Sequence, residues 1–196
     1  FSRDIRLNLP GQHFMGVMRG EDGGTLIRIN RNRITSGMMA RAAQVVVGYN
    51  KSRLHVNDVV RQELGRQSAY PEPGDKLVCL KNNSDYAVVN GLMATTKSEF
   101  RDVDRRNHNF RIDLETDDGV LIEEAPVLTT YFQYPGDTEA MREVPGWAKR
   151  KGLHFDYGYA ITCHKSQGSA FPMGIVIDEA FGSDEALKRR WRYTAV

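Results

Sequence analysis

Apolar residues along the chain follow two spacings, one typical of buried strands and one typical of amphipathic helices. The run Gln44–Gly48 is short, rich in valine and bounded by glycine, which predicts a strand buried on both faces. Residues 51–64 follow directly and carry apolar positions at helical spacing. Residues 159–163 and 174–178 predict two further buried strands, and residues 184–196 predict a final helix. A strand that leads straight into a helix is half of a βαβ unit, so these parts indicate an α/β domain with a parallel sheet.

The first forty residues carry weaker signals. Residues 1–8 predict the end of a helix, and the glycine-rich residues 11–24 predict a loop. Residues 25–29 predict a short strand, and residues 36–42 predict a helix. Near the other end of the chain, Ser183 is placed to cap the final helix.

The character of the sequence changes at Pro71, where short strands with turn signals begin. Lys76–Leu80 predicts a strand, and the Asn-Gly pair at Asn90 predicts a tight turn. Phe110–Glu115 and Val120–Glu124 flank a Thr-Asp-Asp-Gly sequence, which predicts a hairpin. This stretch therefore indicates a small β-barrel inserted into the α/β domain.

The α/β pattern returns near residues 145–147. We therefore expect residues 1–70 to form the first part of the α/β domain and residues 149–196 to form its second part. Residues 71–148 form the expected insertion between them.

The composition is that of an ordinary globular protein, with 196 residues, 40% hydrophobic, 27% charged and a net charge of +2. No apolar run approaches the roughly 18–20 residues of a membrane span, and the start of the chain lacks the apolar core of a signal peptide. We expect a cytoplasmic protein that does not contact a membrane. Cys79 and Cys163 lie far apart, which predicts neither a disulfide framework nor a zinc site. The chain does not begin with methionine, so we expect it to be part of a longer protein.

Residues 155–171 carry the most specific signal in the chain. A strand here ends in a loop that is rich in hydrogen-bond donors and carries one fixed cation, and open α/β sheets hold phosphates in such loops. We expect the hydroxyls of Thr162 and Ser166 to bind DNA phosphates, with His164 and Lys165 adding a donor and a charge. The alternative is an ordinary polar loop, but the whole string, with a strand before it and another after it, favours function.

The string Tyr-Ala-Ile-Thr-Cys-His-Lys-Ser-Gln-Gly-Ser at residues 159–169 resembles motif V of superfamily 1 DNA helicases, in the RecD-like (1B) branch. The resemblance implies a RecA-like fold of the P-loop NTPase type and a role as the second motor domain, called 2A. It implies ATP-dependent unwinding with 5′-to-3′ translocation, and it places Gln167 and Gly168 toward the nucleotide. Many family members have Glu before the motif V Phe, where this chain has Ala170, so the ribose contact of that Glu is not carried over.

The segment Gly48–Arg53 lies at the predicted turn from strand to helix and resembles the motif IVa segment of the same family. The resemblance implies that Asn50 contacts the DNA backbone and that Arg53 lies near it or supports the fold. The helix N-terminus would add donors suited to phosphate. The alternative is that Asn50 caps the helix and that Arg53 is a solvated surface charge.

Residues 74–91 are similar to the start of the SH3-like 2B insertion of RecD-like helicases. The resemblance implies that residues 71–148 form such an insertion, which grips the single strand or transmits motion. A basic run nearby forms either a DNA-facing rim or a solvated loop. It consists of Arg101, Arg105, Arg106 and His108.

Residues 187–196 look like the first part of helicase motif VI, whose continuation supplies the arginine finger to ATP. The sequence stops before that continuation, and it contains no G-x-x-x-x-G-K-[ST] loop for phosphates. Asp178 and Glu179 follow a predicted strand, but they lie downstream of motif V, so we interpret them as a strand-end pair. We expect no catalytic residue and no metal ligand here. ATP and Mg²⁺ would bind mainly through an upstream RecA-like motor domain of the same parent chain, so this chain alone would be inactive.

We therefore expect the C-terminal motor domain of an ATP-dependent DNA helicase that grips single-stranded DNA, of bacterial or phage origin. Three alternatives stay open on sequence alone. The chain could be a non-enzymatic module that binds single-stranded nucleic acid. It could belong to an RNA helicase, because motif V phosphate contacts do not distinguish the sugars. A relaxase fused to a helicase shares these motifs, but it needs a histidine cluster and a catalytic tyrosine elsewhere in the parent chain.

Overall fold

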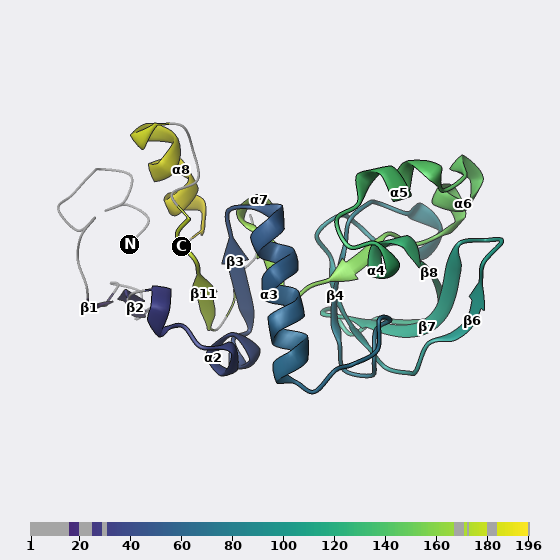
Figure 1. The fold of residues 1–196 in the computed structure, drawn as a ribbon, viewed down its shortest axis with the longest axis horizontal. Coiled ribbons are helices and arrows are strands. Elements are labelled where there is room, and N and C mark those ends of the chain that lie inside the picture. The colour runs from purple at the N-terminus through teal and green to yellow at the C-terminus, as the bar shows by residue number, and fades with distance from the viewer. Residues whose placement is uncertain are drawn as a thin grey trace. The chain divides into compact units, whose positions relative to one another are not determined.

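The computed structural model describes residues 16–19, 25–28, 31–166, 171, 173–179 and 184–195 (Figure 1). The chain divides into two compact units. Unit 1 combines the chain up to Glu63 with the chain from Ala160 onward, and unit 2 is Leu64–Tyr159. In sequence, unit 2 therefore lies between the two parts of unit 1.

Unit 1 is built on a parallel sheet of three strands, which confirms the expected α/β class. The central strand β3 (Gln44–Val47) lies between β10 (Ala160–Thr162) and β11 (Gly174–Val176). All four residues of β3 are buried, as expected for a central strand of a parallel sheet. A 14-residue helix, α3 (Asn50–Glu63), follows β3 after a turn of two residues.

Helix α3 buries a mixed face rather than a purely apolar one. Its buried residues recur three or four positions apart and are Arg53, Val56, Asn57, Val60 and Arg61. The Oδ1 atom of Asn57 accepts a hydrogen bond of 2.7 Å from the backbone N–H of Ala160, so a polar side chain fastens the helix to β10. Leu64, expected on the apolar face, lies beyond the end of the helix and is 44% exposed.

The part of the chain before β3 differs from expectation in one respect. Residues 11–24 were predicted to be a loop, but β1 (Gly16–Arg19) lies within them and pairs antiparallel with β2 (Thr25–Arg28). The glycine-rich composition conceals β1, because its hydrogen bonds come from a partner strand and not from local propensity. Helix α2 (Ser36–Arg41) follows, and the Thr35 side chain caps its start. The predictions for residues 1–8 and for Ser183 lie outside the described residues.

Unit 2 is an antiparallel sheet of six strands. The strands are β4 (Lys76–Cys79), β5 (Met93–Thr96), β6 (Arg101–Asp104), β7 (Asn109–Thr116), β8 (Leu121–Leu128) and β9 (Phe155–Tyr157). They are joined in the order β6-β7-β5-β4-β9, and β8 pairs with β7. The first and last strands of this order do not pair with each other, so the sheet does not form the closed barrel expected from the sequence.

The turns of unit 2 match the sequence signals in part. The predicted hairpin is formed by β7 and β8, and Gly119 adopts a φ of +79° in its turn. A turn also forms at the Asn-Gly pair, where the N–H of Leu92 donates to the carbonyl of Val89 at 3.0 Å. That turn leads from the 3-10 helix η2 (Ser84–Tyr86) into β5 and does not join two paired strands.

The core of unit 2 is aromatic. Phe132 lies on the short helix α4 (Thr130–Gln133) and contacts Phe110 and Tyr157, with ring centroids 5.6 Å and 5.1 Å apart. Helices α5 (Thr138–Glu143) and α6 (Gly146–Lys151) follow α4 (Figure 1). The edge-on contacts of Phe132 with Phe110 and Tyr157 add to the stability gained from burying the rings.

The second boundary of unit 2 lies later in the chain than the sequence suggested. The expected return to the α/β domain was at residues 145–149, but α6 and β9 belong to unit 2 because β9 pairs antiparallel with β4. This pairing joins segments that are 76 residues or more apart in sequence, such as Cys79 and Phe155. Long-range pairing of this kind has no local signal, which explains the displaced boundary.

His154 is buried in unit 2 between two fixed partners. Its Nε2 atom lies 2.8 Å from the carbonyl oxygen of Lys149, so this nitrogen carries the hydrogen, and its Nδ1 atom lies 2.8 Å from the Tyr131 hydroxyl. Burial lowers the pKa of His154, and the hydrogen bond to Lys149 offsets this only in part. Burial also raises the pKa of Tyr131 to about 12. The site therefore holds a neutral imidazole and a neutral phenol at physiological pH.

We expect unit 2 to lose stability as the pH falls below the ordinary histidine pKa of 6.5. Because the folded-state pKa of His154 is lower than that value, the unfolded state binds more protons between the two pKa values. The free energy of unfolding therefore decreases as the pH falls through this window. Urea titrations between about pH 5 and pH 8 measure the effect. A His154→Gln variant that shows the same pH dependence would contradict this assignment.

Candidate nucleic-acid interface

The three parallel strands of unit 1 bring three segments of the chain to one edge of the sheet. Thr162 at the end of β10 is paired with Val47 at the end of β3, and Val176 at the end of β11 is paired with Val46. The residues that follow each strand are therefore neighbours, because the carboxyl ends of parallel strands meet at one edge. This edge is where open α/β sheets bind their ligands.

The end of β10 supplies the first group of predicted residues. Thr162 is half-buried, and α7 (Cys163–Ser166) forms one helical turn directly after it. His164 is exposed and Lys165 is half-buried. These three residues therefore lie at the carboxyl edge of the sheet and are not fully buried.

Ser166 is placed differently from the expectation. It is buried, and its Oγ atom donates a hydrogen bond of 2.8 Å to the carbonyl of Cys163 within α7. Its hydroxyl proton is therefore engaged with the backbone and does not face a phosphate. The predicted loop is a helical turn at this point, and the Ser166 side chain closes that turn.

The neighbouring Cys163 anchors α7 to the last helix, α8 (Glu185–Ala195). Its Sγ atom lies 3.5 Å from the carbonyl oxygen of Trp191, and both residues are buried. Burial raises the pKa of the Cys163 thiol. The thiol is therefore a packed, neutral group and not a nucleophile.

The turn from β3 to α3 supplies the second group. Asn50 is exposed at the first turn of the helix, and its Oδ1 atom accepts a hydrogen bond of 3.0 Å from the Nε atom of Arg53. Arg53 itself is only 5% exposed. It is therefore not the solvated surface charge of the alternative interpretation, and it holds the Asn50 side chain from within the fold.

The sequence did not identify the residue that organises this turn, Glu179. Its Oε2 atom accepts hydrogen bonds from the backbone N–H groups of Gly48 and Tyr49, at 2.8 Å and 3.2 Å. Its Oε1 atom accepts from the hydroxyl of Ser52 and lies 3.8 Å from the guanidinium of Arg31. The carboxylate is 8% exposed. The helix N-terminus, which the sequence offered to a phosphate, therefore already holds an internal anion.

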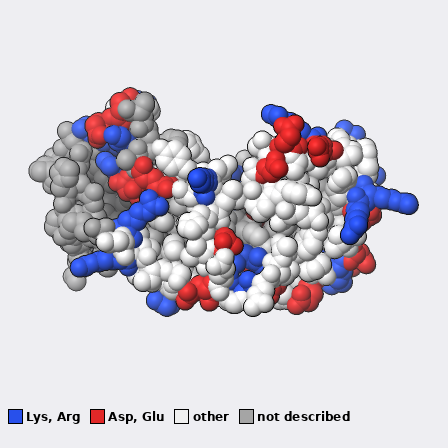
Figure 2. Space-filling model, in the orientation of Figure 1, with Lys and Arg blue, Asp and Glu red and all other residues white. Residues whose placement is uncertain are grey.

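The electrostatics of the edge depend on a few local groups. On the face shown in Figure 2, basic and acidic side chains are interspersed over the described residues, in keeping with the net charge of +2. Affinity for a phosphate chain would then rest on donors such as Thr162 and His164 together with the charge of Lys165.

Other predicted features are only partly visible. Gln167, Gly168 and Ala170 lie outside the described residues. Within the ranges that the structure describes, no group of three or more His, Cys, Asp or Glu residues could hold a metal ion. No helix among those ranges is both long enough and apolar enough to cross a membrane.

Residues 157–196 match the family model of the UvrD-like helicase C-terminal domain. The match covers β10, α7, β11 and α8, and so includes the segment with Thr162, His164 and Lys165. No curated protein matches the chain.

Three solved structures show weak likeness. Pif1 from Bacteroides bound to ssDNA is 17% identical, with 84% of this chain and 43% of that chain covered and a TM-score of 0.48. Pif1 from Bacteroides in complex with ADP-AlF4 is 14% identical, with 97% and 44% covered and a TM-score of 0.44. Pif1 helicase from Candida albicans is 13% identical, with 78% and 43% covered and a TM-score of 0.41. The chain thus spans less than half the length of each of these structures.

Proposed function

We propose that this chain is the C-terminal motor domain of an ATP-dependent superfamily 1 DNA helicase. Unit 1 would be the RecA-like 2A domain, and unit 2 would be the SH3-like 2B insertion. Two findings about the same segment carry the proposal. Residues 157–196 match the helicase family model, and β10, which lies within them, ends at the carboxyl edge of a parallel sheet. That edge carries hydrogen-bond donors and a cation.

Each residue of the edge has a defined task in this proposal. Thr162 and His164 donate to phosphates of single-stranded DNA, and Lys165 supplies a positive charge to the backbone. Asn50 makes a further backbone contact, and Arg53 positions it. By the resemblance to motif V, Gln167 and Gly168 would contact the nucleotide. Such contacts hold the strand without reading its sequence, as a translocating motor requires.

The chain does not contain a complete site for Mg²⁺-ATP. No phosphate-binding loop of the G-x-x-x-x-G-K-[ST] type occurs in its 196 residues. In this proposal an upstream RecA-like domain of the parent chain holds most of the nucleotide, and translocation runs 5′ to 3′ as in the RecD-like branch. We assign no step of hydrolysis to residues of this chain.

Replacement of Thr162 and His164 by alanine together should weaken binding of a labelled dT oligomer by about thirtyfold, since each loses a phosphate contact worth roughly 1 kcal/mol. Fluorescence anisotropy measures the change. The matched control is His55→Ala, which removes an exposed imidazole from the middle of α3.

Lys165→Gln should reduce the slope of log affinity against log salt by about 1. Affinity of the Thr162 and His164 double variant equal to that of His55→Ala, together with an unchanged salt slope in Lys165→Gln, would contradict the proposed interface.

The purified 196-residue chain should show no ATP turnover above background, with or without the dT oligomer. The reason is the missing phosphate-binding loop described above. A coupled assay of ADP release tests this. Turnover that scales with protein concentration and persists through repeated purification would refute the assignment of the nucleotide site to another domain.

A further inference from the structure

Unit 2 contains a surface cavity of its own that the proposed function does not use. Its volume is about 350 Å³, which is within the range of small-ligand sites. Six residues line it: Val103, Arg105, His108, Thr129, Gln133 and Tyr134. They come from the β6–β7 hairpin and from the start and end of helix α4. The cavity therefore combines a cation, an imidazole and an aromatic ring.

The hairpin turn that carries Arg105 and His108 is held in a fixed conformation. The Oδ1 atom of Asp104 accepts hydrogen bonds from the backbone N–H groups of Arg106 and Asn107, at 2.8 Å and 3.0 Å. Hydrogen bonds from Asn107 are the main cause that lowers the pKa of Asp104. The carboxylate is therefore ionised at neutral pH, and the turn keeps its shape before any ligand arrives. Pre-organisation of this kind reduces the entropy lost on binding.

His108 occupies a backbone conformation that favours glycine. Its φ is +54°, in the left-handed region. Its carbonyl accepts hydrogen bonds from the N–H and the hydroxyl of Thr129, at 3.0 Å and 3.2 Å. Among the described residues, the imidazole has no hydrogen-bond partner. The fold therefore holds the backbone of His108, and the described residues leave its imidazole for a ligand.

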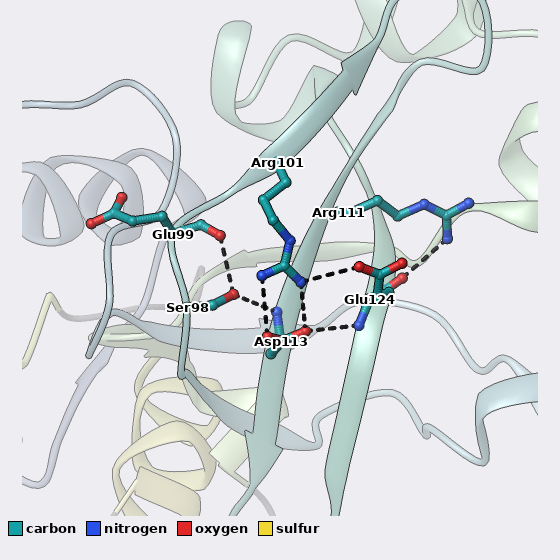
Figure 3. Close-up of polar contacts among 6 residues, drawn as sticks. All are labelled: Ser98, Glu99, Arg101, Arg111, Asp113 and Glu124. Atoms are coloured by element: carbon teal, nitrogen blue, oxygen red, sulfur yellow. Dashed lines mark hydrogen bonds and ion pairs between the residues drawn. The ribbon is translucent and has the colours of Figure 1, made fainter.

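Arg105, in the turn between β6 and β7, differs from the arginines of these two strands in its contacts. Arg101 is 2.9 Å from Asp113 and 3.4 Å from Glu124, and Arg111 donates to the carbonyl of Glu124 (Figure 3). Those two guanidinium groups are engaged within the sheet. Within the described part of the chain, the Arg105 guanidinium has neither an ion pair nor a hydrogen bond. Its planar fork is available for an anion with several oxygens, such as a phosphate.

The lining residues at the end of α4 offer a ring and an amide to the cavity. Tyr134 is 55% exposed, so its ring is open to stacking by a flat ligand. Gln133 donates a 2.6 Å hydrogen bond from Nε2 to the hydroxyl of Tyr70, which fixes its amide and leaves Oε1 as an acceptor. The phosphate donors of the hairpin, together with the stacking ring and amide at the end of α4, match the two halves of a nucleotide.

We propose that this cavity binds one nucleotide unit, with the phosphate at Arg105 and His108 and the base against Tyr134. The unit could come from a free nucleotide or from one position of a single strand, because both present the same chemistry. The site lies entirely in unit 2 and is distinct from the sheet edge of unit 1. It adds a second nucleic-acid contact to the proposed function and does not depend on the first.

The test uses the full 196-residue chain and NMR signals of the histidine rings, with the His108 signal identified by its loss in His108→Gly. Titration with dTMP, a dT oligomer and inorganic phosphate follows that signal. We expect it to shift with dTMP or the oligomer, and Arg105→Gln to weaken this binding at least fivefold. Arg106→Gln removes an equal charge from the same turn outside the cavity, and it should leave binding nearly unchanged.

The backbone supplies a second pair of variants. His108→Gly relieves the strained φ, so it should keep or raise the melting temperature while it weakens nucleotide binding measured by calorimetry. Ala87→Gly relieves an equivalent φ of +52° away from the cavity, and it should affect stability alone. A loss of folding in His108→Gly leaves Arg105→Gln as the test of the site.

Comparing the ligands shows whether the nucleotide is free or part of a strand, and it separates failure of this site from failure of the proposed function. A shift with dTMP identifies free nucleotides, and a shift with the oligomer alone identifies a strand. No shift with either ligand, or an equal shift with phosphate alone, would overturn the assignment. Where the oligomer alone shifts the His108 signal, loss of that shift in Arg105→Gln but not in the Thr162 and His164 variants would support this site. The opposite pattern would contradict this site and support the proposed function.

Discussion

Replacing Asp75 by alanine should lower the free energy of unfolding of unit 2 by roughly 2–5 kcal/mol, because one buried donor and one half-buried donor lose their carboxylate acceptor. Asp75 is fully buried. Its Oδ1 atom accepts from the hydroxyl of Tyr159 at 2.7 Å, and its Oδ2 atom accepts from the N–H of Glu72 at 2.7 Å. Burial and this carboxylate together raise the pKa of Tyr159, so the phenol stays protonated.

The backbone of Asp75 takes part in the same network. Its N–H donates to the carbonyl of Glu72 and to the Oγ1 atom of Thr96, both at 2.9 Å. The N–H of Thr96 donates back to the carbonyl of Asp75 at 3.0 Å. The residue therefore joins the segment that enters β4 to the end of β5 and to the last residue of the unit. Its loss should be felt by the whole sheet.

Urea titrations followed by circular dichroism measure the effect. Asp75→Asn keeps one acceptor and should lose less stability than Asp75→Ala. Combining Asp75→Asn with Tyr159→Phe should show non-additive losses, since the two side chains share one hydrogen bond. Asp118→Ala, in the exposed β7–β8 turn, is the control and should change stability by less than about 0.5 kcal/mol. A loss in Asp75→Ala no larger than in this control would contradict the role of the network.

Replacing Glu179 by alanine should destabilise unit 1 by roughly 2–4 kcal/mol, because three donors at the start of α3 lose their acceptor. Two of these are the N–H groups of Gly48 and Tyr49, and the third is the hydroxyl of Ser52. The carboxylate also complements the positive end of the helix dipole. Because Asn50 follows this turn directly, the change should also weaken oligomer binding.

The two tryptophans of the chain make this measurement specific. Trp191 is buried in unit 1, and Trp147 is in unit 2. In a Trp147→Phe background, the fluorescence of Trp191 therefore reports on unit 1 alone. Glu179→Gln should retain part of the stability. Glu185→Ala removes an exposed carboxylate of the same unit and should leave the urea midpoint unchanged. A midpoint for Glu179→Ala equal to that of Glu185→Ala would show that the turn is held in another way.

Local patterns predicted the elements of unit 1 well. The valine run of β3 and the helical spacing of α3 gave both elements to within one or two residues of their observed limits. The strands at β10 and β11 were expected from their apolar residues, and their parallel pairing followed from the α/β pattern. These features are local, so a single sequence contains them.

Features that depend on distant partners could not be predicted. β9 belongs to unit 2 only because β4 lies beside it, and β1 is a strand only because β2 pairs with it. Glu179 was interpreted as part of a strand-end pair, although its carboxylate reaches a turn 130 residues away in sequence. One signal could have indicated this contact. Two strands predicted to be neighbours in a parallel sheet place the residues after them side by side.

In the candidate site, too, the positions set by local sequence were predicted and the contacts set by the fold were not. Thr162, His164 and Lys165 lie at the sheet edge as their position after a strand suggested. Ser166 is turned into its own helix, because the predicted loop forms a helical turn. The cavity of unit 2 combines a hairpin with the start of a helix 21 residues further along the chain, so the basic run alone could not reveal it.

Photocrosslinking of a dT oligomer with one 4-thiothymidine to the full chain, followed by mass spectrometry of the linked peptides, tests the central claim most directly. The account predicts crosslinks in the segment that contains Thr162, His164 and Lys165, and their loss at high salt. A separate crosslink near Tyr134 would report the cavity of unit 2. Crosslinks that avoid residues 160–166 altogether would contradict the proposed interface.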